Sequence, residues 1–344
     1  SEKVAPIVAP SQPQQIAHQE SNIKASPGTH APLSTIPAQT QDDDEVVVDP
    51  GYNEWLKRIV DELATRDDPN SLVAAALLYT ADGPLDKTNF RQHLLKYLQR
   101  AAALAPRDAS IQALTSMACE TTPGCNPSPY EKTLRAIDPK NALGWYGAFL
   151  QAAQDKDHDA VVSALASMSA TERFDWHWNE NISHVVDAFE STRVPPPGSL
   201  TSANLPILRN AVAVNAIGVW AALATPPFAP LTNNCKSDDL NIVAYCTKIG
   251  AALEHGDNLL VASIGLAIEK NIAAAETPEA ARITEAQRQL RWLMNGQAQF
   301  SGMNMDEWLR LLKENHSEMD AIRSLLVAHG MPATPPDGWT PGKP

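Results

Sequence analysis

Residues 134–146 read LRAIDPKNALGWY, and a similar stretch, AAALAPRDASIQAL, occupies residues 101–114. In each stretch an apolar helix end is followed by a proline and then by Asp108 or Asn141, polar residues of the kind that cap a new helix. Pro106 and Pro139 are 33 residues apart. One antiparallel helix pair has this length, so the spacing predicts a helix–turn–helix repeat.

These stretches resemble the tetratricopeptide repeat, whose second helix ends in a similar string before the next repeat begins. The corresponding strings here are AAALAP (101–106) and LRAIDP (134–139). Trp145 falls where the family has an early aromatic residue, and Ala160 lies within one position of its small second-helix residue. The family's Gly–Tyr spacing after the Trp is not kept. The chain thus resembles degenerate tetratricopeptide-repeat-like proteins of the bacterial cell envelope over about 100–170, and a helix bundle without true repeats is the alternative.

The resemblance implies an all-α fold in which antiparallel helix pairs stack as a degenerate α-solenoid. No single pair can bury its apolar side alone, so stacking stabilises the array. The many alanines suit this packing, because small side chains let helix backbones approach closely. Such a stack is expected to leave a concave groove, lined by the first helix of each pair, that suits a peptide or another extended ligand.

Apolar residues at helical spacing occur throughout residues 52–330, whereas strand-like alternation is almost absent. A helix that starts at a Thr277 cap is expected to stop at Gly296, and residues 225–235 are expected to form a loop. A further break is expected near Ser317. The predicted helices cover 52–66, 71–81, 86–104, 108–119, 128–137, 141–154, 157–168, 169–191, 203–224, 238–254, 258–275, 278–295 and 305–329.

Proline-rich segments divide the chain. Seven prolines, with many Ser and Gln and no aromatic residue before Tyr52, predict a disordered N-terminal tether. An anchor upstream of residue 1 would suit such a tether. Three successive prolines in VPPPGS (194–199) mark an internal boundary, because they exclude a helix interior. The expected organisation is a tether at 1–50, repeat-like helices at 51–193, a helical region continuing the array at 200–330, and an extended tail at 331–344.

The charge balance and the hydropathy restrict the partners. A net charge of −13 disfavours contact with a phosphate backbone, so no nucleic-acid partner is expected. No stretch reaches the ~20 apolar residues that a membrane-spanning helix requires. The chain opens with SEKVAPIV, which has no basic region followed by an apolar core, as a processed mature protein would also show.

The four cysteines form two local pairs in the sequence, Cys119 with Cys125 and Cys235 with Cys246. Short, even spacing favours two disulfides and an exported protein, periplasmic or associated with the cell envelope. Free buried thiols and a zinc site are the alternatives. The zinc site is disfavoured because there is no C-x-x-C spacing and no histidine close to either pair in the sequence.

The stretch RFDWHWNENISH (173–184) carries the most unusual set of side chains. Ser169, with Glu172 three residues later, has the form of a capping box, which predicts a helix over 169–191. That helix would place His177, Glu180 and His184 on one side, where they could bind a partner, hold a metal or perform acid–base chemistry. A solvated helix side above a Trp core is the other interpretation. The candidate binding residues are Trp145, Tyr146, Trp176, His177, Trp178, Glu180 and His184.

The sequence favours a non-enzymatic protein- or peptide-binding or scaffold module in the bacterial envelope, such as an assembly factor or an inhibitor. It contains no phosphate loop, nucleophile elbow or metalloprotease motif, so no catalytic residue, metal or cofactor is assigned. The alternative is an all-α hydrolase or lyase acting on cell-wall glycan through dispersed carboxylates. Asp175 and Glu180 are the acidic residues that best suit this role.

Overall fold

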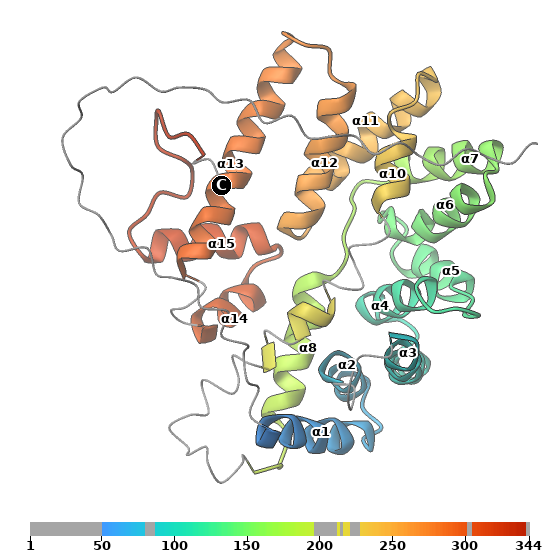
Figure 1. The fold of residues 1–344 in the computed structure, drawn as a ribbon, viewed down its shortest axis with the longest axis vertical. Helices are drawn as coiled ribbons and strands as arrows, with labels where there is room; N and C mark the ends of the chain where they lie inside the picture. Colours follow the sequence, from blue (N-terminus) through green and yellow to red (C-terminus); the bar gives the residue numbers. More distant parts are fainter. Residues whose placement is uncertain are drawn as a thin grey trace, which may run out of the picture. The chain divides into compact units, whose positions relative to one another are not determined.

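The computed structural model describes residues 50–79, 87–195, 212–213, 216–220, 228–300 and 305–341. The chain divides into the units Ser1–Val47 and Val48–Pro344, and everything described lies in the second. The tether expected at 1–50 therefore lies outside the described residues, apart from Pro50. The described part is all-helical, as expected, with one isolated bridge between Asn141 and Arg173 in place of strands (Figure 1).

Within the described ranges, most predicted helices occur within a few residues of their expected ends. The helix predicted over 203–224 lies largely outside the described residues. The bounds are α1 Pro50–Ala64, α2 Pro69–Leu78, α3 Lys87–Leu104, α4 Ala109–Glu120, α5 Ser128–Ile137, α6 Leu143–Asp155, α7 His158–Ser169, α8 Trp178–Glu190, α10 Phe228–Asn234, α11 Leu240–Glu254, α12 Leu259–Ile272, α13 Pro278–Phe300, α14 Met305–Glu314 and α15 Glu318–Ala328.

Several helices begin where a polar side chain accepts a hydrogen bond from the first turn. Asp108 accepts from the N–H of Ile111 at 3.1 Å and so caps α4, as predicted. Ser317 accepts from the N–H of Asp320 at 3.1 Å, which starts α15 at the predicted break. Each such bond satisfies a backbone donor that the helix itself leaves free.

Consecutive helices from α1 to α7 pack against one another, and α4 also contacts α6 (Figure 1). The helices α4 and α5 form one pair, and α6 and α7 form the next. Beyond α7 the contacts continue through α11, α12, α13 and α15 to α14, which packs on α8. Because α8 packs on α2 and α4, the chain of contacts returns to the first helices.

The chain itself covers the side of the first helices that was expected to form an open groove. Helix α8 lies against α2 and α4. On α6, the Tyr146 ring packs against Phe174 at 5.5 Å and Phe228 at 5.7 Å between ring centroids. The expectation of an open groove is therefore wrong at these helices. The apolar side chains that would have lined it are buried against later segments, which removes them from water.

Two predicted helix boundaries are also wrong. Residues 228–234 of the expected loop form α10, which buries Phe228 and Leu231. Gly296 lies inside α13 instead of ending it. A Cβ at this position would lie 2.7 Å from a methyl carbon of Leu326, so the glycine leaves room for this side chain of α15.

Both predicted disulfides are confirmed. Cys119 at the end of α4 is bonded to Cys125, and Cys235, just after α10, is bonded to Cys246 in α11. The bonds are compatible with an exported protein. Among the described helices, none combines the length and the apolar character needed to cross a membrane.

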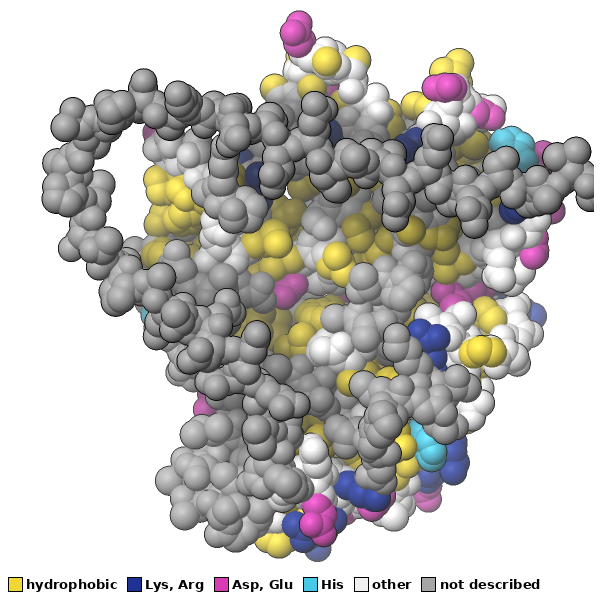
Figure 2. Space-filling view, in the orientation of Figure 1, with side chains coloured by type: hydrophobic (Ala, Val, Ile, Leu, Met, Phe, Trp, Pro, Cys, Tyr) yellow, Lys and Arg dark blue, Asp and Glu magenta, His cyan; other side chains and the backbone are white. Residues whose placement is uncertain are grey.

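Figure 2 shows hydrophobic side chains gathered over the middle of the viewed face, while most of the Lys, Arg, Asp and Glu side chains lie toward its edges. The described Lys and Arg side chains on this face are dispersed and form no single patch.

Candidate functional site

The segment that precedes α8 is an extended loop, so the helix predicted from Ser169 is wrong. Ser169 is the last residue of α7, and its hydroxyl donates to the carbonyl of Ala166. The backbone N–H groups of Glu172 and Arg173 donate to the carbonyl of Lys140, at 3.0 and 3.1 Å. These tertiary hydrogen bonds replace the ones that a helix would have made, and so hold the segment extended.

The turn DPKN (138–141), which joins α5 to α6, fixes the position of this loop through side-chain hydrogen bonds. Asn141 donates through Nδ2 to the carbonyl of Asp175 at 2.8 Å and accepts its N–H through Oδ1 at 3.1 Å. The same Oδ1 accepts from the N–H of Leu143 at the start of α6. Asp138 accepts from Asn141 and from Arg173. The polar residues that end one helix pair and begin the next therefore also position residues 173–175.

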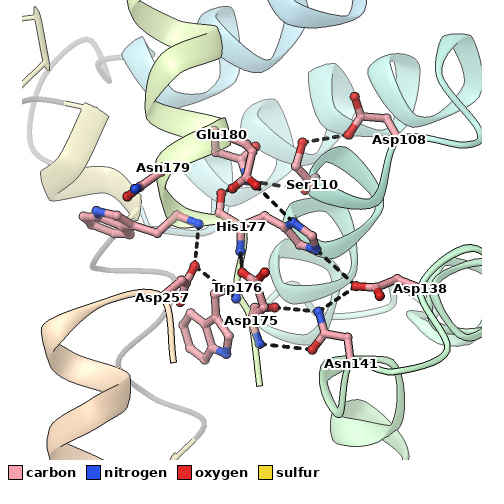
Figure 3. A network of polar contacts seen from close by, with 12 residues as sticks. Asp108, Ser110, Asp138, Asn141, Asp175, Trp176, His177, Asn179, Glu180 and Asp257 are labelled. Carbon is pink, nitrogen blue, oxygen red and sulfur yellow. Dashed lines mark hydrogen bonds and ion pairs between the residues drawn. The ribbon is translucent and has the colours of Figure 1, made fainter. Parts of the chain in front are cut away.

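His177 is buried and sits between acidic side chains (Figure 3). Its backbone has φ 58°, the left-handed region, and α8 begins at the next residue. Its Nε2 lies 3.6 Å from Asp138 Oδ2, and its Nδ1 lies 3.9 Å from Glu180 Oε1. Burial opposes the charged form, but these two carboxylates and Asp175 outweigh it and raise the pKa of His177 to about 10. The imidazole is therefore a cation at neutral pH, which suits an ion-pair role and not that of a general base.

Asp257, in the turn between α11 and α12, holds the same loop from the other side (Figure 3). Its Oδ2 accepts the N–H groups of Trp176 and Trp178 at 3.2 and 2.7 Å, and its Oδ1 accepts from Asn258 at 3.0 Å. Burial, and then the neighbouring Asp175, raise the pKa of Asp257 well above its usual range. Burial therefore favours the protonated form of Asp257, which lies beside the partly exposed side chain of Asp175.

A cavity of about 480 Å³ opens beside this pair. Its size falls within the usual range for small-molecule sites, about 300–1,000 Å³. Apolar side chains of α12 and α13, among them Leu266, Leu290 and Leu293, form part of the wall. The charged residues in the wall come from the loop, from the end of α11 and the turn after it, and from α15. They are Arg173, Asp175, Glu254, Asp257, Asp320 and Arg323. Acidic and basic groups thus meet in one small space.

Three of the aromatic residues predicted to bind a partner lie in the core. Trp176 is 1% exposed and stacks on Phe228, with ring centroids 4.9 Å apart and planes 11° apart. Tyr146 is also 1% exposed. Trp178 is buried, with its ring centroid 6.0 Å from that of Trp220. These rings hold the loop against the helices.

Of the other predicted residues, Glu180 lies beside His177, whereas His184 and Trp145 make contacts elsewhere. His184 lies 3.2 Å from the Ser110 hydroxyl, and burial lowers its pKa. The Glu180 side chain is 54% exposed. Trp145, in α6, carries the guanidinium of Arg135 over its ring at 4.6 Å. Within the described ranges, no three His, Cys, Asp or Glu side chains are placed to hold a metal ion.

Asp257 and Arg323 were not identified from the sequence. Asp257 stands in HGDNLL, which indicates a turn before a helix, and Asn258 does cap α12. Nothing in that pattern connects residue 257 with the backbone of residue 176, because the two are 81 residues apart. Arg323 has the sequence context of an ordinary exposed position on an amphipathic helix.

Comparison with known proteins identifies no relative: no family model, curated protein or solved structure matches this chain.

Proposed function

We propose that this chain is a non-enzymatic binding module that takes a short peptide segment into the cavity beside Asp175 and Asp257. The observation that carries this proposal is the mixed charge of the cavity wall, with Arg173 and Arg323 facing the same space as Asp320 and Glu254. A peptide end offers an ammonium or a carboxylate next to polar backbone groups, and each has a partner of opposite sign here. The apolar wall of α12 and α13 would receive a side chain.

The scaffold is proposed to be a degenerate tetratricopeptide-like solenoid. The 33-residue spacing of Pro106 and Pro139 supports this proposal, and so do the contacts of α4 with α5 and α6 and of α6 with α7. In this view α8 and the loop before it occupy the concave side. The proposed ligand site therefore lies not in the expected groove but at the other end of the loop, between α11, α13 and α15.

The two disulfides support an oxidising compartment, so we propose the periplasm or the cell envelope as the location. An assembly factor, or an inhibitor that recognises the end of a partner chain, would use such a site.

Calorimetric titration of the full chain with tripeptides that have free termini tests the proposal. We expect binding that weakens at least tenfold when both termini are blocked by acetylation and amidation. Arg323→Gln should weaken binding about as much, because it removes a cation from the cavity. Arg310→Gln is the matched control, since Arg310 also makes an ion pair within its helix but is not among the cavity residues. Binding that is absent, or equal for free and blocked peptides, would contradict the proposal.

The second candidate is a cell-wall glycan hydrolase or lyase. Asp175 and Asp257 favour it, because both line the cavity and burial favours the protonated form of Asp257, which could then supply general acid chemistry. Glu180 is not among the residues that line this cavity, so it is the weaker partner for Asp175. Release of soluble fragments from purified peptidoglycan, abolished by Asp175→Asn but not by Glu180→Gln, would favour this candidate over binding alone.

A further inference from the structure

A second cavity, of about 690 Å³, lies where the Cys119–Cys125 loop faces α6 and α10. Its lining includes the amide side chains of Gln151, Gln154, Asn233 and Asn234. Glu120 is the one ionisable side chain among the described residues that line it. The wall therefore offers a carboxyl group and polar side chains, with no basic group among the described residues that line it.

A second carboxyl group, that of Glu131, lies against Gly147 of α6, although Glu131 is not itself among the residues that line the cavity. A Cβ on Gly147 would lie 1.7 Å from Glu131 Oε1 and 2.5 Å from Glu120 Oε1. The missing side chain of Gly147 thus provides the space in which the two carboxyl groups meet, at a residue that itself lines the cavity. Glu131, on α5, is only 4% exposed and points at this space.

Both carboxyl groups keep an oxygen without a partner. Glu120 Oε2 and Glu131 Oε1 are buried and accept no hydrogen bond from any described residue. Arg135 lies 3.7 Å from Glu131, but on the other oxygen, Oε2. Burial, and then the neighbouring Glu131, raise the pKa of Glu120 to about 8. Unpaired buried acceptors are costly, so the arrangement lacks a donor once Glu120 ionises.

We propose that this cavity binds a primary ammonium group, held between Glu120 and Glu131 at Gly147. An ammonium carries three hydrogen-bond donors and a positive charge. It can therefore donate hydrogen bonds to both carboxylates at once and offset their charge. The amide side chains of the lining are available to the rest of the ligand. A lysine side chain and an amino sugar share this chemistry. The proposal concerns a different cavity from the proposed peptide site and does not depend on it.

The test uses calorimetric titration of the full chain with two pairs of probes. Nα-acetyl-lysine N-methylamide is compared with its Nε-acetylated form, and glucosamine is compared with N-acetylglucosamine. We expect at least one ammonium probe to bind at least tenfold more tightly than its acetylated counterpart, and the pair that does so identifies the source. Equal binding within both pairs, or no binding of either ammonium probe, would overturn the proposal.

The proton on Glu120 supplies a second readout. Since the carboxyl group must ionise to pair with the ammonium, affinity for the lysine probe should rise about tenfold or more between pH 6 and pH 8, with release of a proton. Glu120→Gln should remove both the binding and this pH dependence. Glu276→Gln, at an exposed position away from the cavity, should change neither. Unchanged affinity in Glu120→Gln would overturn the proposal.

Gly147→Ala tests the space between the carboxyl groups. The added methyl group should abolish ammonium binding by separating Glu120 from Glu131. Gly218→Ala is the matched control, because a Cβ there meets no atom of a described residue within 4 Å. Circular dichroism checks that the variants fold, and Glu120→Gln decides the question if Gly147→Ala does not fold. A folded Gly147→Ala variant with wild-type affinity would overturn the proposal.

Discussion

The side chain of Asn141 is hydrogen-bonded to both backbone groups of Asp175, which lies 34 residues away in the sequence. Asn141 is 1% exposed, whereas Asp175 is half-buried. The residue that starts a helix in the repeat-like motif therefore also fixes a residue that lines the candidate cavity.

Asn141→Ala should lower the free energy of unfolding by about 2–3 kcal/mol, because it leaves partly buried backbone groups of the loop without their partners. Chemical denaturation at neutral pH measures the change. Asn241→Ala, at an exposed position in the first turn of α11, should stay within about 0.5 kcal/mol of wild type. Equal stability of the two variants would show that the hydrogen bonds of Asn141 contribute little.

His177→Asn should remove a pH dependence of stability. The folded state raises the pKa of His177 from 6.5 to about 10, so its ion pairs stabilise the fold fully below pH 6.5, and this contribution is lost as the pH rises through about 10. Asparagine tolerates the left-handed backbone at this position. We expect the variant to be less stable at pH 7 and to lose the decline between pH 7 and 10, as measured by denaturation in that range. A decline that persists unchanged would rule out His177 as its source.

Glu120→Gln should also remove a pH dependence of stability, in a lower pH range. The folded state raises the pKa of Glu120 from 4.5 to about 8, so the wild type is favoured by its bound proton below pH 4.5 and loses this contribution as the pH rises through about 8. Glutamine cannot ionise, so the unfolding free energy of the variant relative to wild type should increase from pH 5 to pH 8. Denaturation series at the two pH values check this, with Glu276→Gln as the reference. A difference that does not change with pH would contradict the prediction.

Removing the disulfide of α11 by Cys235→Ser with Cys246→Ser should destabilise the protein by about 2–3 kcal/mol, because the bond closes an 11-residue separation in the unfolded chain. Thermal unfolding measures the loss. Mass spectrometry after alkylation gives an independent check: the native protein should take up no label, and the reduced, unfolded protein should take up four. Labelling of the native protein would mean that the bonds are not formed.

Much of the helical architecture was predictable from local patterns. Asp108 and Ser317 stand before apolar runs, and each makes the cap that such a residue makes in any helix. The cysteine pairs were also predictable, because each lies within a short segment whose ends must stay close. Local chemistry decides these features, and the sequence displays local chemistry directly.

The failures share one physical cause. Ser169 and Glu172 have the form of a capping box, yet the loop that follows is extended because its backbone bonds to Lys140. Gly296 has the sequence context of a residue that ends a helix. It lies inside α13 instead, where its lack of a side chain leaves room for Leu326 of another helix. In each case a contact between distant segments outweighs the local preference.

For the candidate site, the sequence pointed to Asp175 but not to its partner. The prediction came from the unusual composition of residues 173–184, and Asp175 does line a cavity. Asp257 and Arg323 reach that cavity only because α11, α12 and α15 pack around the loop. No spacing rule relates residues so far apart.

The sequence by itself determined that the chain is helical, where most helices begin, and which cysteines are joined, because each of these depends on neighbours a few residues away. Tertiary structure alone decided that the loop before α8 fills the expected groove, and that Glu131 meets Glu120 across Gly147. These outcomes depend on which apolar surfaces are buried against each other and on which buried polar groups meet, and packing sets both.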